Sequence, residues 1–183
     1  MNSKKLFNLD GKVSIVTGGT GHLGKSMAEG LAEMGAHVFI TSREKSKALE
    51  TKNSFSEDII DRIDVEELDI LSLDSIKKCF NRIKNNSNKI DILVNNAGNI
   101  PSGNYENMSE KVWNDGMDGL INGVFRCTKE IIPIMEQNGE SSIINIASMY
   151  GVVSPDPSIY EESGLNSLPN YGASKTAIIQ YTK

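Results

Sequence analysis

Short apolar runs alternate along the chain with longer segments in which apolar residues recur every three or four positions. Runs of this kind, rich in β-branched residues, predict buried strands, and the periodic segments predict helices. The predicted strands are 13–17, 37–41, 63–68, 90–94 and 142–147. Strands that alternate with helices favour an α/β fold, in which one parallel sheet carries helices on both faces.

The first predicted helix follows the first strand and ends at Gly35. Its apolar stripe consists of Leu23, Met27, Leu31 and Met34. Later helices are predicted over 73–84, before a polar turn at 85–89, and over 109–136, with an interruption near Pro133.

Composition narrows the class of protein. At 183 residues the chain fits a single domain over 1–183, and a net charge of -5 makes nucleic acid an unexpected partner. No segment has the pattern of a secretory leader or a membrane span, so we expect no membrane association and a cytoplasmic location. Cys79 and Cys127 are isolated, which predicts reduced, buried thiols and no metal site.

A glycine-rich turn joins the first strand to the first helix. Gly19, Gly21 and Gly24 fit the pattern GxGxxG. Its glycines allow a tight turn, close backbone approach to a pyrophosphate, and close packing of the helix on the strand. Because the pattern lies between a predicted strand and a predicted helix, it indicates a dinucleotide-binding site.

The end of the second strand bears on the choice of dinucleotide. NAD-binding sheets usually have a carboxylate there, which bonds the ribose 2′-hydroxyl. This chain has Thr41, Ser42 and Arg43 instead. An arginine can pair with a 2′-phosphate, so the sequence favours NADP over NAD. Alternatively, Arg43 only opens a solvated helix.

Further polar residues lie where other strands end. Asp69 follows the third strand, Asn95 follows the fourth and Ser148 the fifth. Tyr171 and Lys175 share one face of the last predicted helix, because they are four residues apart. A cation about 4 Å from a phenol is worth roughly 4 kcal/mol at an effective dielectric of 20, enough to let tyrosine exchange protons near neutral pH. By itself this spacing also occurs by chance on many helices.

Together these features resemble the short-chain dehydrogenase/reductase family from about Leu9 to Lys183. The resemblance is carried by Thr17, Gly18, Gly24, Asp69, Asn95, Asn96, Ala97, Gly98, Ser148, Tyr171 and Lys175. It implies a Rossmann-like, doubly wound parallel sheet with the strand order 3-2-1-4-5.

The resemblance also implies a role for each residue. Tyr171 would donate a proton to a substrate carbonyl, or remove one from the alcohol, while hydride passes to or from the nicotinamide. Lys175 would lower the pKa of Tyr171 and bond the nicotinamide ribose, and Ser148 would hold the substrate oxygen. The cofactor-binding residues that it implies are Gly18, Thr20, Gly21, His22, Leu23, Gly24, Ser42, Arg43, Asp69, Ile70, Asn95, Ala97, Gly98, Tyr171 and Lys175.

Three departures from the family pattern affect this interpretation. His22 replaces the usual second glycine, and Gly21 gives the spacing of the branch that acts on nucleotide sugars. Leu120 stands where an asparagine commonly completes a proton relay, and Asn122 would face elsewhere on a regular helix. The third departure is the interval from Ser148 to Tyr171, which is longer than in the family.

The long interval implies an insertion around 155–168 that borders the site and shapes substrate choice. Its candidate polar contacts are Tyr160, Glu161 and Glu162, although a solvated loop is the alternative.

The family continues well past Lys175, whereas this sequence ends at Lys183. We therefore expect a C-terminally incomplete domain without the later strands, and a fifth strand left as an exposed apolar edge. The resemblance is compatible with a homo-oligomer, although the shortened last helix argues against the usual dimer contact.

The sequence thus predicts an NADP(H)-dependent oxidoreductase, with NAD as the other cofactor option, that interconverts a carbonyl and a secondary alcohol on a small polar substrate. The first alternative is a nucleotide-sugar epimerase or dehydratase, suggested by the glycine spacing. The second is a non-catalytic dinucleotide-binding module, suggested by Leu120 and the early end of the sequence.

Overall fold

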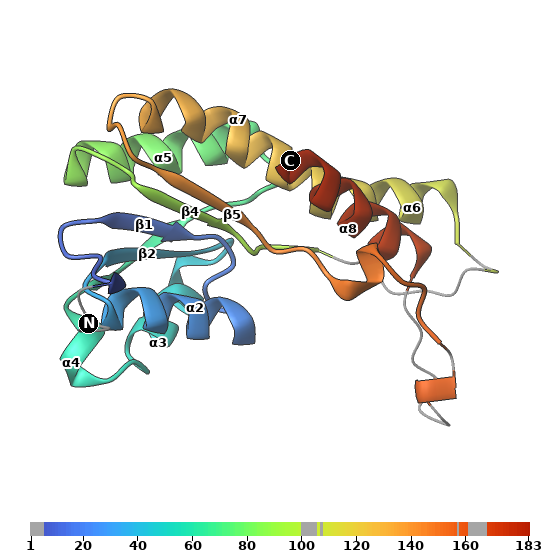
Figure 1. Cartoon of the computed structure of the whole chain (residues 1–183), viewed down its shortest axis with the longest axis horizontal. Helices are drawn as coiled ribbons and strands as arrows, with labels where there is room; N and C mark the ends of the chain where they lie inside the picture. The colour runs from blue at the N-terminus through green and yellow to red at the C-terminus, as the bar shows by residue number, and fades with distance from the viewer. Residues whose placement is uncertain (1–5, 100–105, 107, 157, 161–167) are drawn as a thin grey trace. The chain divides into compact units, whose positions relative to one another are not determined.

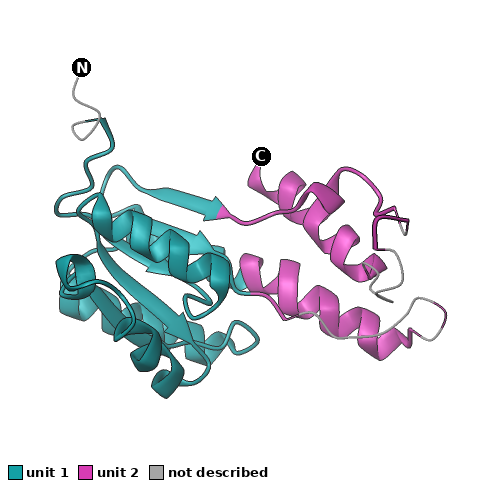
Figure 2. Cartoon of the chain, turned by 90° about the horizontal axis from the view of Figure 1, so that it is seen from below, with its two compact units in different colours: residues 1–97, 126–144 teal, residues 98–125, 145–183 magenta. Residues whose placement is uncertain are grey.

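The computed structural model describes residues 6–99, 106, 108–156, 158–160 and 168–183. The chain forms two compact units, coloured separately in Figure 2. Unit 1 comprises Met1–Ala97 and Arg126–Ile144, and unit 2 comprises Gly98–Phe125 and Asn145–Lys183. The single domain over 1–183 stays a prediction.

Strands and helices alternate as the apolar pattern predicts (Figure 1). The elements are β1 (Val13–Val16), α2 (His22–Glu33), β2 (His37–Ser42), α3 (Lys45–Lys52), α4 (Glu57–Ile60), β3 (Ile63–Glu67), α5 (Leu73–Ser87), β4 (Ile92–Asn95), α6 (Glu110–Met117), the π-helical turn η2 (Asp118–Asn122), α7 (Gly123–Met135), β5 (Ser142–Asn145), the 3₁₀ turn η3 (Met149–Gly151) and α8 (Pro169–Thr182).

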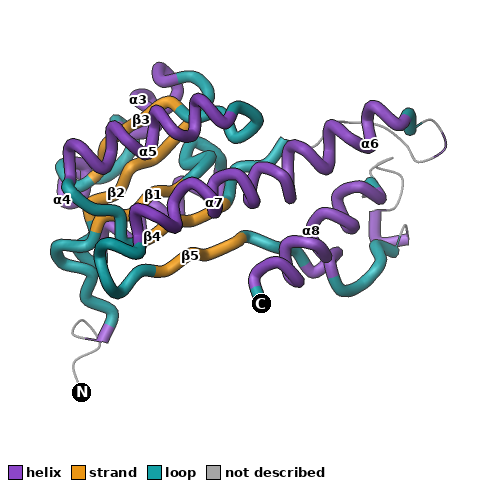
Figure 3. Tube along the Cα trace, turned by 90° about the horizontal axis from the view of Figure 1, so that it is seen from above, coloured by secondary structure: helices purple, strands orange, loops and turns teal. Residues whose placement is uncertain are grey.

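The five strands form one sheet in the order β3-β2-β1-β4-β5, which confirms the predicted order. The pairs β1–β2, β1–β4 and β2–β3 are parallel. In unit 1, α5 and α7 cover one face of the sheet, and α2 and α3 lie on the other (Figures 1 and 3). This is the doubly wound arrangement that strands alternating with helices favour.

The main apolar core lies between the sheet and the helices α5 and α7. The helix α5 turns Ile76, Phe80 and Ile83 into it. Cys79 and Cys127 are also buried there and form no disulfide. Burial raises the pKa of each thiol to about 12, so both stay protonated at neutral pH.

The apolar stripe predicted for α2 is wrong by one helical position. The side chain of Leu23 is 60% exposed and Met34 is also exposed, whereas the buried residues are Gly24, Ala28 and Ala32. A Cβ atom on Gly24 would lie only 2.3 Å from the carbonyl oxygen of Gly18. The helix approaches the glycine turn too closely for large side chains, so small residues form its buried face.

Two predicted boundaries also move. The break within 109–136 is the π-helical turn η2, and Pro133 lies near the end of α7 without interrupting it. A proline so close to the end of a helix forgoes one backbone hydrogen bond only, and the Gln137 amide donates to its carbonyl at 2.9 Å. The helix α5 continues into the predicted polar turn and ends at Ser87, followed by its C-cap Asn88, which has the left-handed φ of 61°.

The strand β5 is the last strand at one side of the sheet, and the side chain of its Ile144 is 44% accessible to solvent. Across the part of the chain that the structure describes, no helix has both the length and the apolar character needed to cross a membrane.

The packing of α2 predicts opposite effects of the same substitution at two glycines. Gly24→Ala forces a Cβ atom into the Gly18 carbonyl, so we expect the free energy of unfolding to fall by at least about 1 kcal/mol. At Gly30 a Cβ atom would meet nothing within 4 Å, so Gly30→Ala should raise it by about 0.5–1 kcal/mol. Urea denaturation of both variants measures these changes, and equal effects would contradict the close packing of α2.

Candidate functional site

Candidate cofactor-binding residues of unit 1 lie together at one edge of its sheet. The glycine turn follows β1, Ser42 and Arg43 come at the end of β2, Asp69 and Ile70 follow β3, and Asn95 and Ala97 come at the end of β4. Since these strands are parallel, their carboxyl ends share an edge, where open α/β sheets bind ligands.

The glycine turn directs the backbone N–H groups at the start of α2 toward that edge. Gly18 has the left-handed φ of 63°, and its carbonyl accepts the N–H of Gly21 at 3.1 Å. The helix then begins at His22, with Gly21 as its N-cap. It has no side-chain cap and no acidic residue in its first turn. The first N–H groups of α2 can therefore bind an anion.

A hydrogen-bond network joins the ends of β1 and β4. The side-chain amide of Asn96 donates to the carbonyls of Thr17 at 2.9 Å and Gly18 at 3.1 Å. In return, the hydroxyl of Thr17 accepts the backbone N–H groups of Asn96 and Ala97, each at 3.0 Å. This network fixes the glycine turn against the end of β4.

Arg43 follows β2 directly and is exposed. Its neighbour Glu44 forms an ion pair with Lys47 at 2.7 Å rather than with Arg43. Within the described ranges, the guanidinium of Arg43 has no hydrogen bond or ion pair, so it is available to an anionic ligand.

On the next strand the carboxylate of Asp69 accepts the backbone N–H of Leu71 at 3.0 Å. Buried Asn95 donates to the hydroxyl of Thr128 at 3.1 Å. Asp69 and Asn95 therefore both form hydrogen bonds within unit 1 at the carboxyl edge of the sheet.

The catalytic candidates lie together in unit 2. Ser148 follows β5 and caps η3, its hydroxyl accepting the N–H of Tyr150 at 3.2 Å. The helix α8 carries Tyr171 and Lys175, and η3 packs against it. Pro169 begins α8, where its fixed φ suits the first helical turn. These three side chains are thus presented by two packed elements.

Lys175 is only 8% exposed, although it carries an amine. Its ammonium donates to the carbonyl of Ile146 at 2.5 Å and lies 5.6 Å from the centroid of the Tyr171 ring. Burial lowers the pKa of Lys175. The predicted shared face of Tyr171 and Lys175 is therefore present.

Asn170 is a residue that the sequence analysis missed. It is fully buried, and its amide donates to the carbonyl of Val112 on α6 at 3.1 Å. Gly116 makes room for it, because a Cβ atom there would lie 2.1 Å from the Asn170 amide nitrogen. A polar residue directly before Tyr171, with a glycine in the facing helix, was the available signal. Asn170 thus fixes the turn of α8 that carries Tyr171.

At Leu120, where the resemblance to the family leads one to expect a relay asparagine, the structure has a buried apolar side chain. Leu120 is 2% exposed and packs against Gly98, one of the predicted cofactor-binding residues. Asn122 is exposed and bonds Asp118 on its own helical turn at 3.1 Å. The π-helical turn therefore does not bring Asn122 into the place of Leu120.

The inserted segment is described in part. Tyr160 is present and hydrogen-bonded to Tyr150. Glu161 and Glu162 lie outside the described residues. The residues that are described include no cluster of side chains able to hold a metal ion.

Comparison with known proteins gives consistent matches. Residues 12–183 match the family model described as short chain dehydrogenase. The chain is 32% identical over 176 residues to 3-oxoacyl-acyl-carrier-protein reductase of Vibrio cholerae, covering 96% of this chain and 66% of the relative. It is 34% identical over 181 residues to the reductase of the same name from Aquifex aeolicus, with the same coverage. The chain thus spans about two thirds of the length of these curated relatives.

Two solved structures are also similar to this chain. The crystal structure of gox2181 has a TM-score of 0.85 and 27% identity, covering 99% of this chain and 67% of that one. A variant of actinorhodin polyketide ketoreductase, solved with NADPH, has a TM-score of 0.81 and 28% identity, covering 93% of this chain and 62% of that one.

The buried amide of Asn170 predicts a stability effect. Asn170→Ala removes its hydrogen bond to α6 and leaves a cavity, so we expect the free energy of unfolding to fall by about 1–3 kcal/mol. Asn114→Ala, at an exposed position of α6, is the matched control and should change it by less than about 0.5 kcal/mol. Urea denaturation compares them, and an equal effect would contradict the role assigned to Asn170.

Proposed function

We propose that this chain, which belongs to the short-chain dehydrogenase/reductase family, binds NADPH and interconverts a carbonyl and a secondary alcohol. The observation that carries this proposal is the buried ammonium of Lys175 beside the ring of Tyr171 on α8. A buried cation needs a reason, because desolvation disfavours its charge. Stabilising negative charge on a phenol that exchanges protons supplies one.

The proposed roles follow from this geometry. In reduction, Tyr171 gives its phenolic proton to the substrate oxygen, and in oxidation it takes that proton back. The charge of Lys175 stabilises the oxygen left behind, while the Ile146 carbonyl fixes the ammonium in place. The hydroxyl of Ser148 holds the substrate oxygen by a hydrogen bond. When bound, the nicotinamide cofactor supplies or accepts the hydride.

The residues of unit 1 fit such a cofactor. The left-handed Gly18 and the uncapped start of α2 suit a pyrophosphate, which needs close backbone approach and exposed N–H groups. Arg43, with no partner in the described part of the chain, suits a 2′-phosphate, and this favours NADPH over NADH. The solved ketoreductase neighbour with NADPH supports the same choice.

The substrate we propose is a small polar carbonyl compound. The inserted segment beside Ser148 supports a polar group, since its described residues include Tyr160. We also propose a cytoplasmic location, which the two free cysteines support. A homo-oligomer stays a prediction.

A second candidate is a non-catalytic dinucleotide-binding module. The observation that favours it is Leu120, which fills the place of the relay asparagine with a buried apolar side chain. The epimerase or dehydratase alternative keeps only the glycine spacing in its favour.

The proposed contact of Arg43 with a 2′-phosphate predicts that its removal weakens the binding of NADPH but not of NADH. Arg43→Ala should weaken NADPH binding about ten- to a hundredfold, because a charge-assisted hydrogen bond to phosphate is lost, and should leave NADH binding within about twofold. Lys45→Ala removes an exposed positive charge nearby and serves as the control. Calorimetric titration at fixed salt measures all three proteins. Equal losses in the two variants would show a general charge effect and contradict the assignment of Arg43.

The proposed role of Tyr171 as a proton donor predicts a loss of carbonyl reduction when its hydroxyl is removed. Tyr171→Phe removes the proton donor, so we expect kcat/KM for NADPH oxidation with a panel of aldehydes and ketones to fall about a hundred- to ten-thousandfold. NADPH affinity should stay within about twofold. Tyr181→Phe, on the same helix, should retain activity. If neither the unmodified chain nor any variant turns over a carbonyl while NADPH still binds, the non-catalytic alternative holds.

A further inference from the structure

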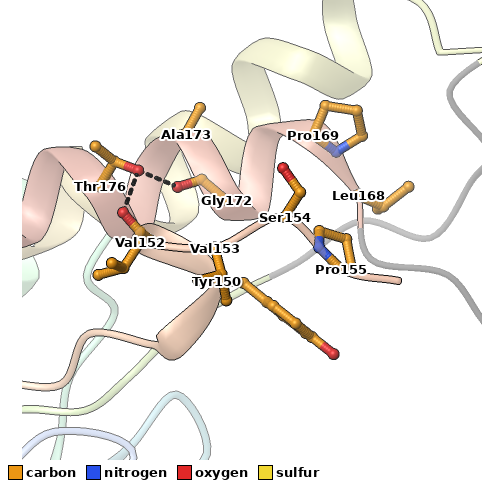
Figure 4. Close-up of a pocket in the computed structure, with 11 residues that line it drawn as sticks. Tyr150, Val152, Val153, Ser154, Pro155, Leu168, Pro169, Gly172, Ala173 and Thr176 are labelled. Atoms are coloured by element: carbon orange, nitrogen blue, oxygen red, sulfur yellow. Dashed lines mark hydrogen bonds between the residues drawn. The ribbon is translucent and has the colours of Figure 1, made fainter. Parts of the chain in front are cut away.

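A pocket of 420 Å³ lies along the first turns of α8, within unit 2. One wall is a flank of the helix that includes Pro169, Gly172 and Thr176, and the other is the segment after Ser148, from Tyr150 to Pro155 (Figure 4). Gly172 and Thr176 each follow Tyr171 and Lys175 by one residue, so this flank lies about a quarter of a turn around α8 from the face that carries the catalytic candidates. The volume is in the range of small-molecule pockets.

The lining of this pocket has no charged side chain among the described residues. It combines the apolar surfaces of valine, proline and leucine with the hydroxyl groups of Tyr150, Ser154 and Thr176. The Thr176 hydroxyl is already committed to the carbonyl of Gly151 at 2.8 Å. An anionic group bound here would lose water without gaining a counter-charge, which is costly. An uncharged group that carries hydroxyls could form hydrogen bonds with the polar lining and place its apolar faces against the valine, proline and leucine side chains.

Tyr160 is hydrogen-bonded to a residue that lines the pocket. The ring of Tyr150 extends away from α8 (Figure 4), and its hydroxyl is hydrogen-bonded to that of Tyr160. This hydrogen bond raises the pKa of Tyr160. Ser148 accepts the N–H of Tyr150, which ties this wall to the candidate site.

We propose that this pocket binds the non-reacting part of the substrate, that the group it takes is uncharged and polyhydroxylated, as in a neutral ketose or polyol, and that the Tyr150–Tyr160 pair determines this specificity. The inference rests on the proposed function, because it assigns the substrate class of the same site.

The test uses three five-carbon ketones that differ only in what surrounds the reacting carbonyl. D-xylulose is neutral and hydroxylated, D-xylulose 5-phosphate adds a charge, and 2-pentanone lacks the hydroxyls. NADPH oxidation by the unmodified chain should give a kcat/KM for xylulose about tenfold or more above both others. A preference for the phosphate or for 2-pentanone would overturn the inference while leaving the proposed function intact.

The variants Tyr150→Phe and Tyr160→Phe each remove one hydroxyl and keep the ring. Each variant should raise KM for xylulose about two- to tenfold, because the free energy of one hydrogen bond is lost. The value of kcat for xylulose should stay within about twofold, and the kinetic constants for 2-pentanone should not change. The double variant should be no worse than the more impaired single one, because the two hydroxyls act as a unit. Tyr181→Phe is the matched control, and thermal unfolding checks that every variant is folded. An unchanged KM for xylulose in both single variants would overturn the role of the pair.

Saturation-transfer NMR with the same three ketones separates the two proposals. If xylulose binds to the unmodified chain and binds more weakly to Tyr150→Phe and Tyr160→Phe, the pocket assignment is supported. If no ketone is reduced in that case, only the proposed function is contradicted. If xylulose does not bind in preference to the other two ketones, the pocket assignment is wrong.

Discussion

The carboxyl edge of the sheet depends on the hydrogen bonds between Thr17 and Asn96. Two hydrogen bonds join Thr17 to Asn96, one joins Asn96 to Gly18 and one joins Ala97 to Thr17, so four hydrogen bonds link the ends of β1 and β4. A buried polar group left unpaired costs about 1–3 kcal/mol, so these partners specify one another strongly. Gly18 must then turn with a positive φ, and a Cβ atom on it would lie 2.9 Å from the Cα of Ala97. The start of α2 is directed toward the edge as a consequence.

A second constraint organises unit 2. The helix α8 buries an amine, Lys175, whose partner is the carbonyl of Ile146 at the end of β5. On its other side, Asn170 and Ser174 bond α6, to Val112 and to the sulfur of Met117. Polar groups in a low-dielectric interior are stable only when their partners are correctly placed. The helix is therefore fixed in rotation and along its axis, and this orients Tyr171.

The departures from the family pattern have different structural meanings. Leu120 belongs to the packing of unit 2, where it lies buried against Gly98. His22 is exposed at the first residue of α2, so it changes the surface that would face a pyrophosphate. The predicted insertion includes Tyr160, which is hydrogen-bonded to Tyr150. Only the last of these departures adds a new contact beside the candidate catalytic residues.

The sequence by itself determined the strands and the positions of the glycine turn and of the pair Tyr171 and Lys175, while the order of the strands was implied only by the resemblance to the family. Those features depend on local chemistry: apolar runs, glycines that permit a tight turn, and a four-residue helical spacing. Tertiary structure decided which face of α2 is buried, because close packing selects the small residues Gly24 and Ala28 over larger apolar ones. It also decided the partners of Asn170 and Tyr160, since hydrogen bonds between segments distant in the chain leave no periodic signal in the sequence.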